Sequence, residues 1–293
     1  MPSNRWLPWI YSLPMIALVG LTFGYPILCL FAYSVEHVGR SIYLPTRFVG
    51  LRNFQYVATD SLFLDALSNN LRLFLCVPVL LALGVPLAQL LHDRPRFWKV
   101  YRSLLFVPYI LSIPVVGVVF GYIFQYQGQL NSGLHALGLD ALAKDWLGST
   151  TWAMPTIMAI IVWKELGFGI ILCLARLSSV GEQYFEAARV DGANWWQVLR
   201  HITVPVLVPT LAFYAIVELI NMLSWVFSYI YVMTLGGPQN STVVTEYYIY
   251  QQVFQNGQIG VGAAAGLFLL VIVSLLLGLR MWLTQRLAAY DSD

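Results

Sequence analysis

Apolar residues gather along the chain in six long runs, and polar or glycine-containing segments separate one run from the next. About 20 mostly apolar residues are enough to cross the hydrocarbon core of a bilayer as a helix. We therefore predict six membrane-spanning helices, at residues 9–35, 71–91, 103–124, 151–177, 208–235 and 259–283. The first run is too long for a cleaved signal peptide and has no small-residue cleavage pattern, so we expect a retained span.

The amino-acid composition distinguishes a membrane protein from a soluble one. Hydrophobic residues make up 59% of the chain and charged residues 10%, against about 25% charged residues in ordinary soluble domains. We therefore predict an all-α membrane protein. A net charge of +2 without a dense basic cluster argues against nucleic acid as a partner. The cysteines lie inside apolar runs and the histidines are scattered, so no disulfide and no metal site is expected.

Basic residues predict the orientation of the chain in the membrane, because cytoplasmic loops carry an excess of Lys and Arg. They concentrate beside both termini and in two loops, after the second and the fourth predicted spans: Arg5, Arg94, Arg96, Lys99, Arg102, Arg176, Arg189, Arg200, Arg280 and Arg286. This pattern predicts that both termini are cytoplasmic. The loop after the first span disagrees, with Arg40, Arg47 and Arg52, but it is one loop against the rest.

The segment at 182–205 interrupts the apolar pattern. Glu182 to Val190 is good helix material, and Asp191-Gly192 supplies a turn, because glycine adopts a positive φ freely. A second short helix is expected at 193–202, with Pro205 marking the return to the membrane. Such a compact knob, with small residues and aromatic anchors, suits docking to a partner protein. The alternative is an amphipathic helix pair that rests on lipid headgroups.

This segment resembles the EAA loop of importer permeases of the ATP-binding-cassette (ABC) class. In that family the pattern is EAA, three residues, Gly, about nine residues and I-x-L-P; this chain has EAARVDG and ITVP, with Val204 in place of the usual Leu. The resemblance implies a type I ABC importer transmembrane domain. It also implies that the following residues couple the chain to an ATPase subunit: Glu186, Ala187, Ala188, Asp191, Gly192 and Pro205.

Further motifs resemble carbohydrate-uptake permeases, and in particular the family of the maltose F and glycerol-3-phosphate A subunits. They are FVGLRNF at 48–54, GQLN at 128–131, WL at 146–147 and TLGGP at 234–238, followed by ST and YYIYQQVF. The resemblance implies a heterodimer with a second permease subunit, two ATPase subunits that bind ATP and Mg, an extracytoplasmic solute-binding protein and a carbohydrate substrate. This chain would then be a multi-pass protein of the bacterial inner (plasma) membrane, in contact with lipid and without a cofactor of its own.

Polar residues inside predicted spans are candidates for the substrate site, because they are costly in lipid. In the fifth span, Glu218, Asn221, Trp225 and Ser228 are spaced three, four and three apart, which places them on one helical face. Ser224 and Tyr229 flank this stripe, and carboxylate, amide, indole and hydroxyl groups suit a saccharide. The alternative is a seam between helices. The resemblance favours the site, and adds Glu165 and Gly167 from the fourth span.

Lys164 and Glu165 are adjacent charges inside the fourth span. Neighbours on a helix point about 100° apart, so we do not expect these two to pair with each other, and a Lys164–Glu218 pair is our hypothesis.

Gly167 and Gly169 either thin the helix where substrate passes or permit close packing. Asn69 and Asn70 are expected to cap the second span.

The sequence predicts no catalytic residues. It has no Walker A, H-E-x-x-H or G-x-S-x-G motif, so ATP hydrolysis would belong to a separate partner.

The alternative function is an ion-coupled secondary transporter of small polar solutes, a class that often contains internal repeats. We find no repeat between the halves of this chain. Lys164 is the one cation available to a pocket, which favours a neutral glycoside over an anionic substrate.

Overall fold

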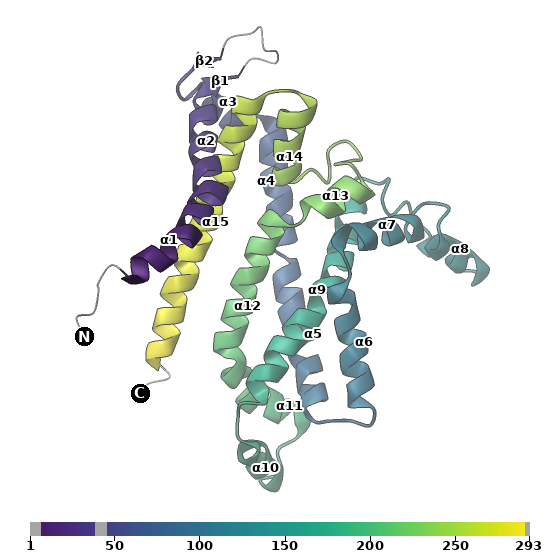
Figure 1. The fold of residues 1–293 in the computed structure, drawn as a ribbon. Helices are drawn as coiled ribbons and strands as arrows, with labels where there is room; N and C mark the ends of the chain where they lie inside the picture. The colour runs from purple at the N-terminus through teal and green to yellow at the C-terminus, as the bar shows by residue number, and fades with distance from the viewer. Residues whose placement is uncertain (1–6, 39–45, 291–293) are drawn as a thin grey trace. The chain divides into compact units, whose positions relative to one another are not determined.

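The computed structural model describes residues 7–38 and 46–290, which are almost entirely helical (Figure 1). A short hairpin pairs β1 (Glu36–His37) with β2 (Arg47–Phe48) in antiparallel register. Arg5 and Arg40, two of the basic residues near the first span, lie outside the described residues. The chain divides into two compact units, residues 1–64 with 248–271 and residues 65–247 with 272–293.

The first unit contains the apolar N-terminal helices and the start of the C-terminal helix. Its elements are α1 (Leu7–Val19), a π-helical turn (Gly20–Gly24), α2 (Tyr25–Ser34), α3 (Arg52–Thr59), a second π-helical turn (Gln251–Gln255) and the first part of α15 (Ile259–Tyr290). Asn53 on α3 donates hydrogen bonds of 2.9 Å to the carbonyls of Ser34 and Glu36. Gly260 packs so closely on the Glu36 carbonyl that a Cβ there would collide with it.

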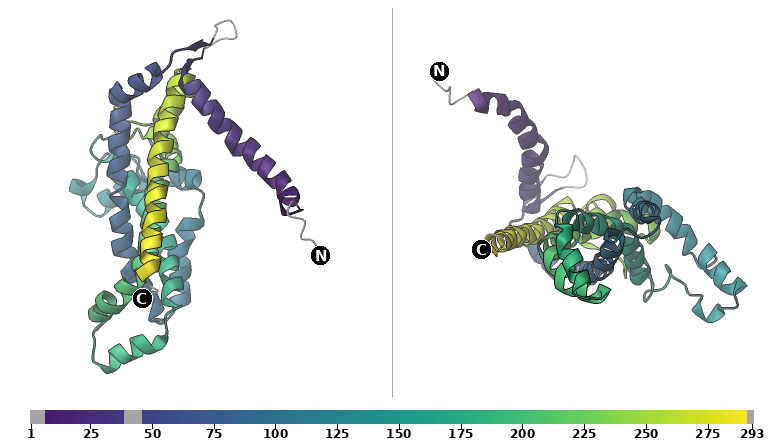
Figure 2. Two further views of the ribbon diagram at one scale, coloured as in Figure 1. Left: turned by 90° about the vertical axis from the view of Figure 1, so that its left-hand side faces the viewer. Right: turned by 90° about the horizontal axis from the view of Figure 1, so that it is seen from below.

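The second unit is a bundle around α9, which packs against α5, α6 and α12. Its elements include most of α4 (Ser61–Leu73), then α5 (Cys76–His92), α6 (Trp98–Ile110), α7 (Ile113–Ile123), α8 (Gln129–Ala136), α9 (Ala153–Leu177), α10 (Glu182–Val190), α11 (Trp195–Val198), α12 (Val204–Ser224), α13 (Phe227–Met233) and the start of α14 (Thr245–Tyr250). Both α10 and the loop between α5 and α6 lie at one end of this unit (Figures 1 and 2).

Five helices of the described ranges are long and apolar enough to cross a membrane: Tyr11–Ser34, Ser61–His92, Ala153–Leu177, Trp195–Ser224 and Ile259–Leu279. A sixth span is obtained if α6 and α7 are taken together, but these two helices meet at 98°. The predicted span at 103–124 therefore consists of two helices and not of one. Leu111 and Ser112 are extended, and Pro114 at the start of α7 has no N–H with which to continue the α6 ladder.

Two other predicted boundaries also differ. The second span begins at Ser61, ten residues before the predicted start at 71, and Asn69 and Asn70 in this added part are buried inside the protein. The fifth predicted span, 208–235, is broken: α12 ends at Ser224 and a separate helix, α13, begins at Phe227. Trp225 between them has a non-helical φ of −129°.

Asn69 and Asn70 do not cap a helix, contrary to expectation, because both lie inside α4. Asn70 is fully buried; its side-chain N–H donates to the Met222 carbonyl at 2.8 Å, and its oxygen accepts from the Thr245 N–H at 2.9 Å. Asn69 donates to the Val243 carbonyl at 2.8 Å. The Met222 carbonyl lies in the last turn of α12 and the Thr245 N–H in the first turn of α14, where these groups have no intrahelical partner, so Asn70 joins the end of one helix to the start of another.

We predict that Asn70→Leu lowers the midpoint of thermal aggregation in mild detergent by about 5 °C, because it leaves a buried carbonyl and a buried N–H unpaired. Leu71→Ala is the matched control, since the Leu71 side chain is exposed at 58% and its loss removes no hydrogen bond. Fluorescence-detected size exclusion after heating measures both variants. Equal midpoints for Asn70→Leu and the unsubstituted protein would contradict this role of Asn70.

Candidate functional site

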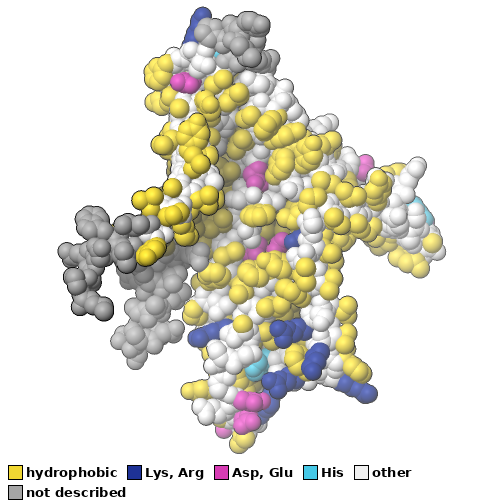
Figure 3. All heavy atoms as spheres, in the orientation of Figure 1, with side chains coloured by type: hydrophobic (Ala, Val, Ile, Leu, Met, Phe, Trp, Pro, Cys, Tyr) yellow, Lys and Arg dark blue, Asp and Glu magenta, His cyan; other side chains and the backbone are white. Residues whose placement is uncertain are grey.

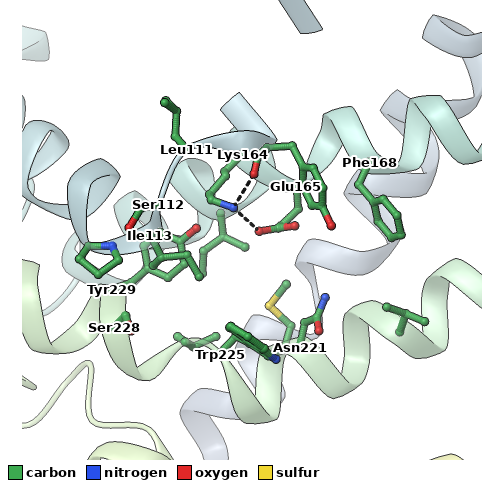
Figure 4. A pocket seen from close by; sticks show the side chains of 16 residues that line it. Leu111, Ser112, Ile113, Lys164, Glu165, Phe168, Asn221, Trp225, Ser228 and Tyr229 are labelled. Atoms are coloured by element: carbon green, nitrogen blue, oxygen red, sulfur yellow. Dashed lines mark hydrogen bonds and ion pairs between the residues drawn. The ribbon is translucent and has the colours of Figure 1, made fainter. Parts of the chain in front are cut away.

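A pocket of about 610 Å³ lies in the second unit, where a bend and a break of the chain come together beside α9. Its walls are the bend between α6 and α7, the middle of α9, and the break between α12 and α13 (Figure 4). Tyr109 and Ser112 come from the bend, Glu165 from α9, and Asn221 and Trp225 from the end of α12. The backbone interruptions thus coincide with the pocket wall, which is typical of solute sites inside membrane proteins.

Lys164 and Glu165 pair with each other, so the expectation that they would not is wrong. The Lys164 ammonium donates to a Glu165 carboxylate oxygen at 3.2 Å and to the Tyr109 carbonyl at 3.2 Å (Figure 4). It also lies 5.2 Å from the centre of the Tyr109 ring. The Tyr109 carbonyl has no intrahelical partner because α6 ends at Ile110, and the long lysine side chain reaches both acceptors.

Glu218 does not belong to this ion pair, contrary to the Lys164–Glu218 hypothesis. Its side chain is fully buried, and no ion pair within 4.0 Å involves it among the described residues. Neither carboxylate oxygen accepts a hydrogen bond of normal geometry there, although the Asn221 amide one turn along interacts with it. Glu218 therefore lies behind the pocket wall, between packed helices.

The predicted stripe on the fifth span is divided by the break after Ser224. Asn221, Trp225 and Ser228 line the pocket, whereas Glu218 and Ser224 do not. The Glu246 carboxylate accepts a hydrogen bond of 2.8 Å from the Phe227 N–H and so caps the first turn of α13. Burial raises the pKa of Glu246 to about 7, while that N–H and the Val226 N–H oppose the shift. This cap stabilises the break that turns Trp225 and Ser228 to the pocket.

Gly167 and Gly169 lie at close helix contacts. A Cβ at Gly167 would collide with the Leu105 carbonyl of α6, and one at Gly169 would lie 2.6 Å from the Tyr214 ring of α12. Neither glycine lines the pocket. Of the two roles considered, the geometry favours close packing.

Several pocket residues were not predicted as substrate ligands, among them Tyr109, Ser112 and Tyr229. The Tyr229 hydroxyl is buried with no hydrogen-bond partner in the described part of the chain. Tyr109 stacks on Phe168, with ring centres 5.1 Å apart and planes at 10°. The one signal for the bend was the pair of prolines, Pro108 and Pro114, inside an apolar run.

The predicted coupling segment forms a knob at one end of the unit. After α10, the Gly192 N–H bonds to the Arg189 carbonyl at 3.1 Å and the Ala193 N–H to the Ala188 carbonyl at 2.9 Å. These two bonds and the φ of +78° at Gly192 define a Schellman motif, which requires a left-handed residue. Asn194 and Gln197 then form a reciprocal capping box at the start of α11.

The knob has a buried side and an exposed side. Phe185 is buried in a cluster with residues of α5 and α9, and Arg189 forms an ion pair of 3.4 Å with Asp93. Glu186, Ala187 and Asp191 are exposed. Val190 is exposed at 87% and Trp196 at 69%, although both carry large apolar side chains. Large exposed apolar groups beside small residues make a surface suited to a partner.

Pro205 does not separate two helices as expected. The chain runs from α11 through a π-helical turn (Leu199–Thr203) into α12, and Trp195–Ser224 forms one long helix. Proline is tolerated at the start of α12 because the π-helical turn before it changes the hydrogen-bond pattern. The expected second short helix is therefore the beginning of a membrane span.

No group of three or more His, Cys, Asp or Glu side chains arranged to hold a metal ion occurs within 7–38 and 46–290. The chemistry of the pocket is instead that of aromatic rings, an amide, hydroxyls and one ion pair. Groups of this kind can bind and orient a polar solute.

Comparisons with known proteins point to transport. Residues 81–289 match the family described as "Binding-protein-dependent transport system inner membrane component". The lactose transport system permease protein LacF of Rhizobium radiobacter is 31% identical, over 84% of this chain and 83% of its own length. The sulfoquinovosyl glycerol transport system permease protein SmoG of Agrobacterium fabrum is 32% identical, over 89% and 85%. The multiple sugar-binding transport system permease protein MsmF of Streptococcus mutans is 28% identical, over 97% of each chain.

A solved structure matches the whole fold. A chain of a bacterial alginate ABC transporter, crystallised in complex with an alginate pentasaccharide-bound periplasmic protein, has a TM-score of 0.80 and 26% identity to this chain. The match covers 96% of this chain and 95% of that one. The predicted fold class, an all-α membrane domain of the type I ABC importer kind, is confirmed.

Proposed function

The chain belongs to the family of binding-protein-dependent transport system inner membrane components, and from this premise we propose that it is one permease subunit of an ATP-driven importer of a neutral sugar or glycoside. The observation that carries the proposal is the combination of a solute pocket at helix breaks with an exposed, Schellman-capped knob at one end of the same unit. The relatives named above are sugar permeases, and nothing in them favours an ion-coupled secondary transporter.

The pocket chemistry supports a carbohydrate. The indole of Trp225 is exposed at 63% and offers a flat surface for the apolar face of a sugar ring. Asn221, Ser228 and the unpaired Tyr229 hydroxyl offer hydrogen bonds to sugar hydroxyls. Because Glu165 neutralises Lys164 within the pocket, the site presents no free charge from this pair, which favours a neutral solute over an anionic one.

The partners follow from the family and from the knob. A second permease would complete the translocation path, and two ATPase subunits would bind ATP and Mg. One ATPase subunit would hold the exposed side of α10, with Glu186, Ala187, Ala188, Asp191 and Gly192 at the contact and Pro205 at the start of α12. An extracytoplasmic binding protein would dock on the opposite side and deliver solute. Both termini and α10 would then face the cytoplasm. Transport requires that ATP and the loaded binding protein favour one conformation over another.

A pull-down tests the assembly. The chain is tagged, extracted from its own host in mild detergent, and its partners are identified by mass spectrometry. We expect an ATPase, a second permease and a binding protein. Recovery of the tagged chain without any of these partners would contradict the proposal.

Uptake kinetics test the pocket. We predict that Trp225→Ala raises the KM for the transported glycoside about tenfold, since it removes the stacking surface. Trp9→Ala is the matched control, because its indole is exposed at 66% and lies outside the pocket. Radiolabelled solute, identified with the co-purified binding protein, provides the readout. An unchanged KM in Trp225→Ala would remove Trp225 from the solute site.

A further inference from the structure

A second pocket, of about 380 Å³, lies beside the loop between α5 and α6 and is not part of the proposed solute path. Lys and Arg side chains gather over this end of the second unit (Figure 3). Arg94 from the loop and Arg102 from α6 line the pocket. Trp98, four residues before Arg102 on α6, lies on the same helix face and also lines it. One wall is therefore cationic, with an indole at its edge.

The charges of this wall are available to a ligand. Among the described residues, neither Arg94 nor Arg102 forms an ion pair within 4.0 Å. Glu182 is the one acidic residue among those lining the pocket, so the two arginines outnumber it. The Nδ1 atom of His92, which also lines the pocket, is buried without a hydrogen-bond partner in the described part of the chain. Guanidinium groups bind phosphate oxygens through paired hydrogen bonds.

The opposite wall is apolar. Ile171, Leu174 and Ala175 on α9 line it, with Ser178 one turn further along. The adjoining surface of α6 is apolar as well: Val100 is exposed at 53%, Tyr101 at 48% and Leu104 at 64%, as expected of residues in contact with lipid tails. A free phosphate ion gains nothing from contact with an apolar wall. A phospholipid is stabilised by it, because the glycerol backbone and first acyl carbons require apolar contact below the headgroup.

We propose that this pocket binds the headgroup of an anionic glycerophospholipid, such as phosphatidylglycerol, from the cytoplasmic leaflet. Arg94 and Arg102 would donate to the phosphate, Trp98 would lie at the interface, and Ile171 and Leu174 would contact the glycerol and upper acyl carbons. The inference rests on the proposed function only for the orientation that places α10 on the cytoplasmic side. Basic pockets between helices on that side are typical sites for anionic headgroups.

The pocket also adjoins the knob. Val180 and Glu182, at the start of the segment that leads into α10, line the same cavity as Arg94 and Arg102. A lipid seated there would contact both the α5–α6 loop and the beginning of α10. Lipid composition would in that case affect the segment that we propose to dock on the ATPase.

Lipid retention by the purified protein tests the site. The full-length chain, in the complex with which it purifies, is delipidated and titrated with phosphatidylglycerol or phosphatidylcholine, and bound lipids are counted by native mass spectrometry. We expect one tightly retained phosphatidylglycerol. Replacing both arginines (Arg94→Gln with Arg102→Gln) should weaken it at least tenfold, since charge-assisted hydrogen bonds to phosphate are lost.

The matched control removes the same charge from the same segment. In Arg96→Gln with Lys99→Gln, the lost cations lie over the Phe97 and Trp98 rings, at 5.1 and 6.0 Å, and do not line the pocket. The affinity of this control variant for phosphatidylglycerol should change less than threefold. Equal losses in both double variants, no preference for phosphatidylglycerol, or displacement of lipid by millimolar inorganic phosphate would each overturn the proposal. Because the assay needs neither solute nor ATP, its outcome is independent of whether the chain transports a sugar.

Discussion

Gly192→Val is expected to lower solute uptake tenfold to hundredfold while the complex still assembles. Gly192 has a φ of +78° in the Schellman motif that ends α10, and a β-branched residue is strongly disfavoured there. The strain of about 2 kcal/mol would be relieved by turning α10 relative to α11. No atom lies within 4 Å of the Cβ position, so the substitution creates no clash in the core. When both are measured on the same vesicles, ATP hydrolysis should continue while solute uptake falls.

Two control variants isolate the position of this glycine. Gly192→Asn should retain most of the uptake, because asparagine tolerates the left-handed conformation. Gly138→Val places the same strain in an equivalent motif after α8, where φ is +71° and no atom lies within 4 Å. It should cost similar thermal stability and keep ATP hydrolysis coupled to uptake. Normal coupled uptake by Gly192→Val would show that the knob does not transmit the ATPase motion.

Lys164→Ala is expected to produce the other large effect, a marked loss of thermal stability together with loss of uptake. The Glu165 side chain is exposed at only 12%, and removal of Lys164 leaves its carboxylate without a counter-charge. It also leaves the Tyr109 carbonyl, at the end of α6, without its donor. Breaking a buried ion pair on one side typically costs about 3 to 5 kcal/mol. Size exclusion after heating and vesicle uptake measure the two effects.

A second substitution identifies the true partner of Lys164. Glu165→Gln in the Lys164→Ala background removes the unpaired charge, so most of the thermal stability should return. Glu218→Ala in the same background should restore nothing, because Glu218 lies outside the ion pair. Uptake in these variants reports separately on the pocket, which Glu165 lines. Rescue by Glu218→Ala and not by Glu165→Gln would contradict the ion pair seen here.

Local chemistry made several features predictable. A membrane span needs a long apolar run, which is continuous in sequence, so the helical membrane class was readable without a structure. The turn at Gly192 is equally local, because the Schellman motif uses only residues from Ala188 to Ala193. Part of the candidate pocket was also accessible, since Asn221, Trp225 and Ser228 are polar or aromatic residues within an apolar run.

The rest depended on contacts between distant segments. Periodicity assumed one straight helix through Ser228, but α12 ends at Ser224 and Glu246 of α14 caps the separate helix that follows. Within α12, Glu218 lies one turn before Asn221 but is fully buried between packed helices, so it does not line the pocket. The bend at Leu111 likewise turned one predicted span into two helices and exposed the Tyr109 carbonyl to Lys164, 55 residues later.

The sequence by itself thus determined the membrane class, the approximate spans and the helix–turn–helix form of the segment that we propose for coupling, because lipid solvation and turn formation act over a few consecutive residues. The tertiary structure alone decided that Asn70 joins Met222 to Thr245, that Lys164 pairs with Glu165, and that Gly167 packs on α6. The first two depend on where another helix ends, and the third on how closely α6 approaches α9. A helix end leaves carbonyl and N–H groups unpaired, and the side chain that satisfies them is set by packing across the bundle.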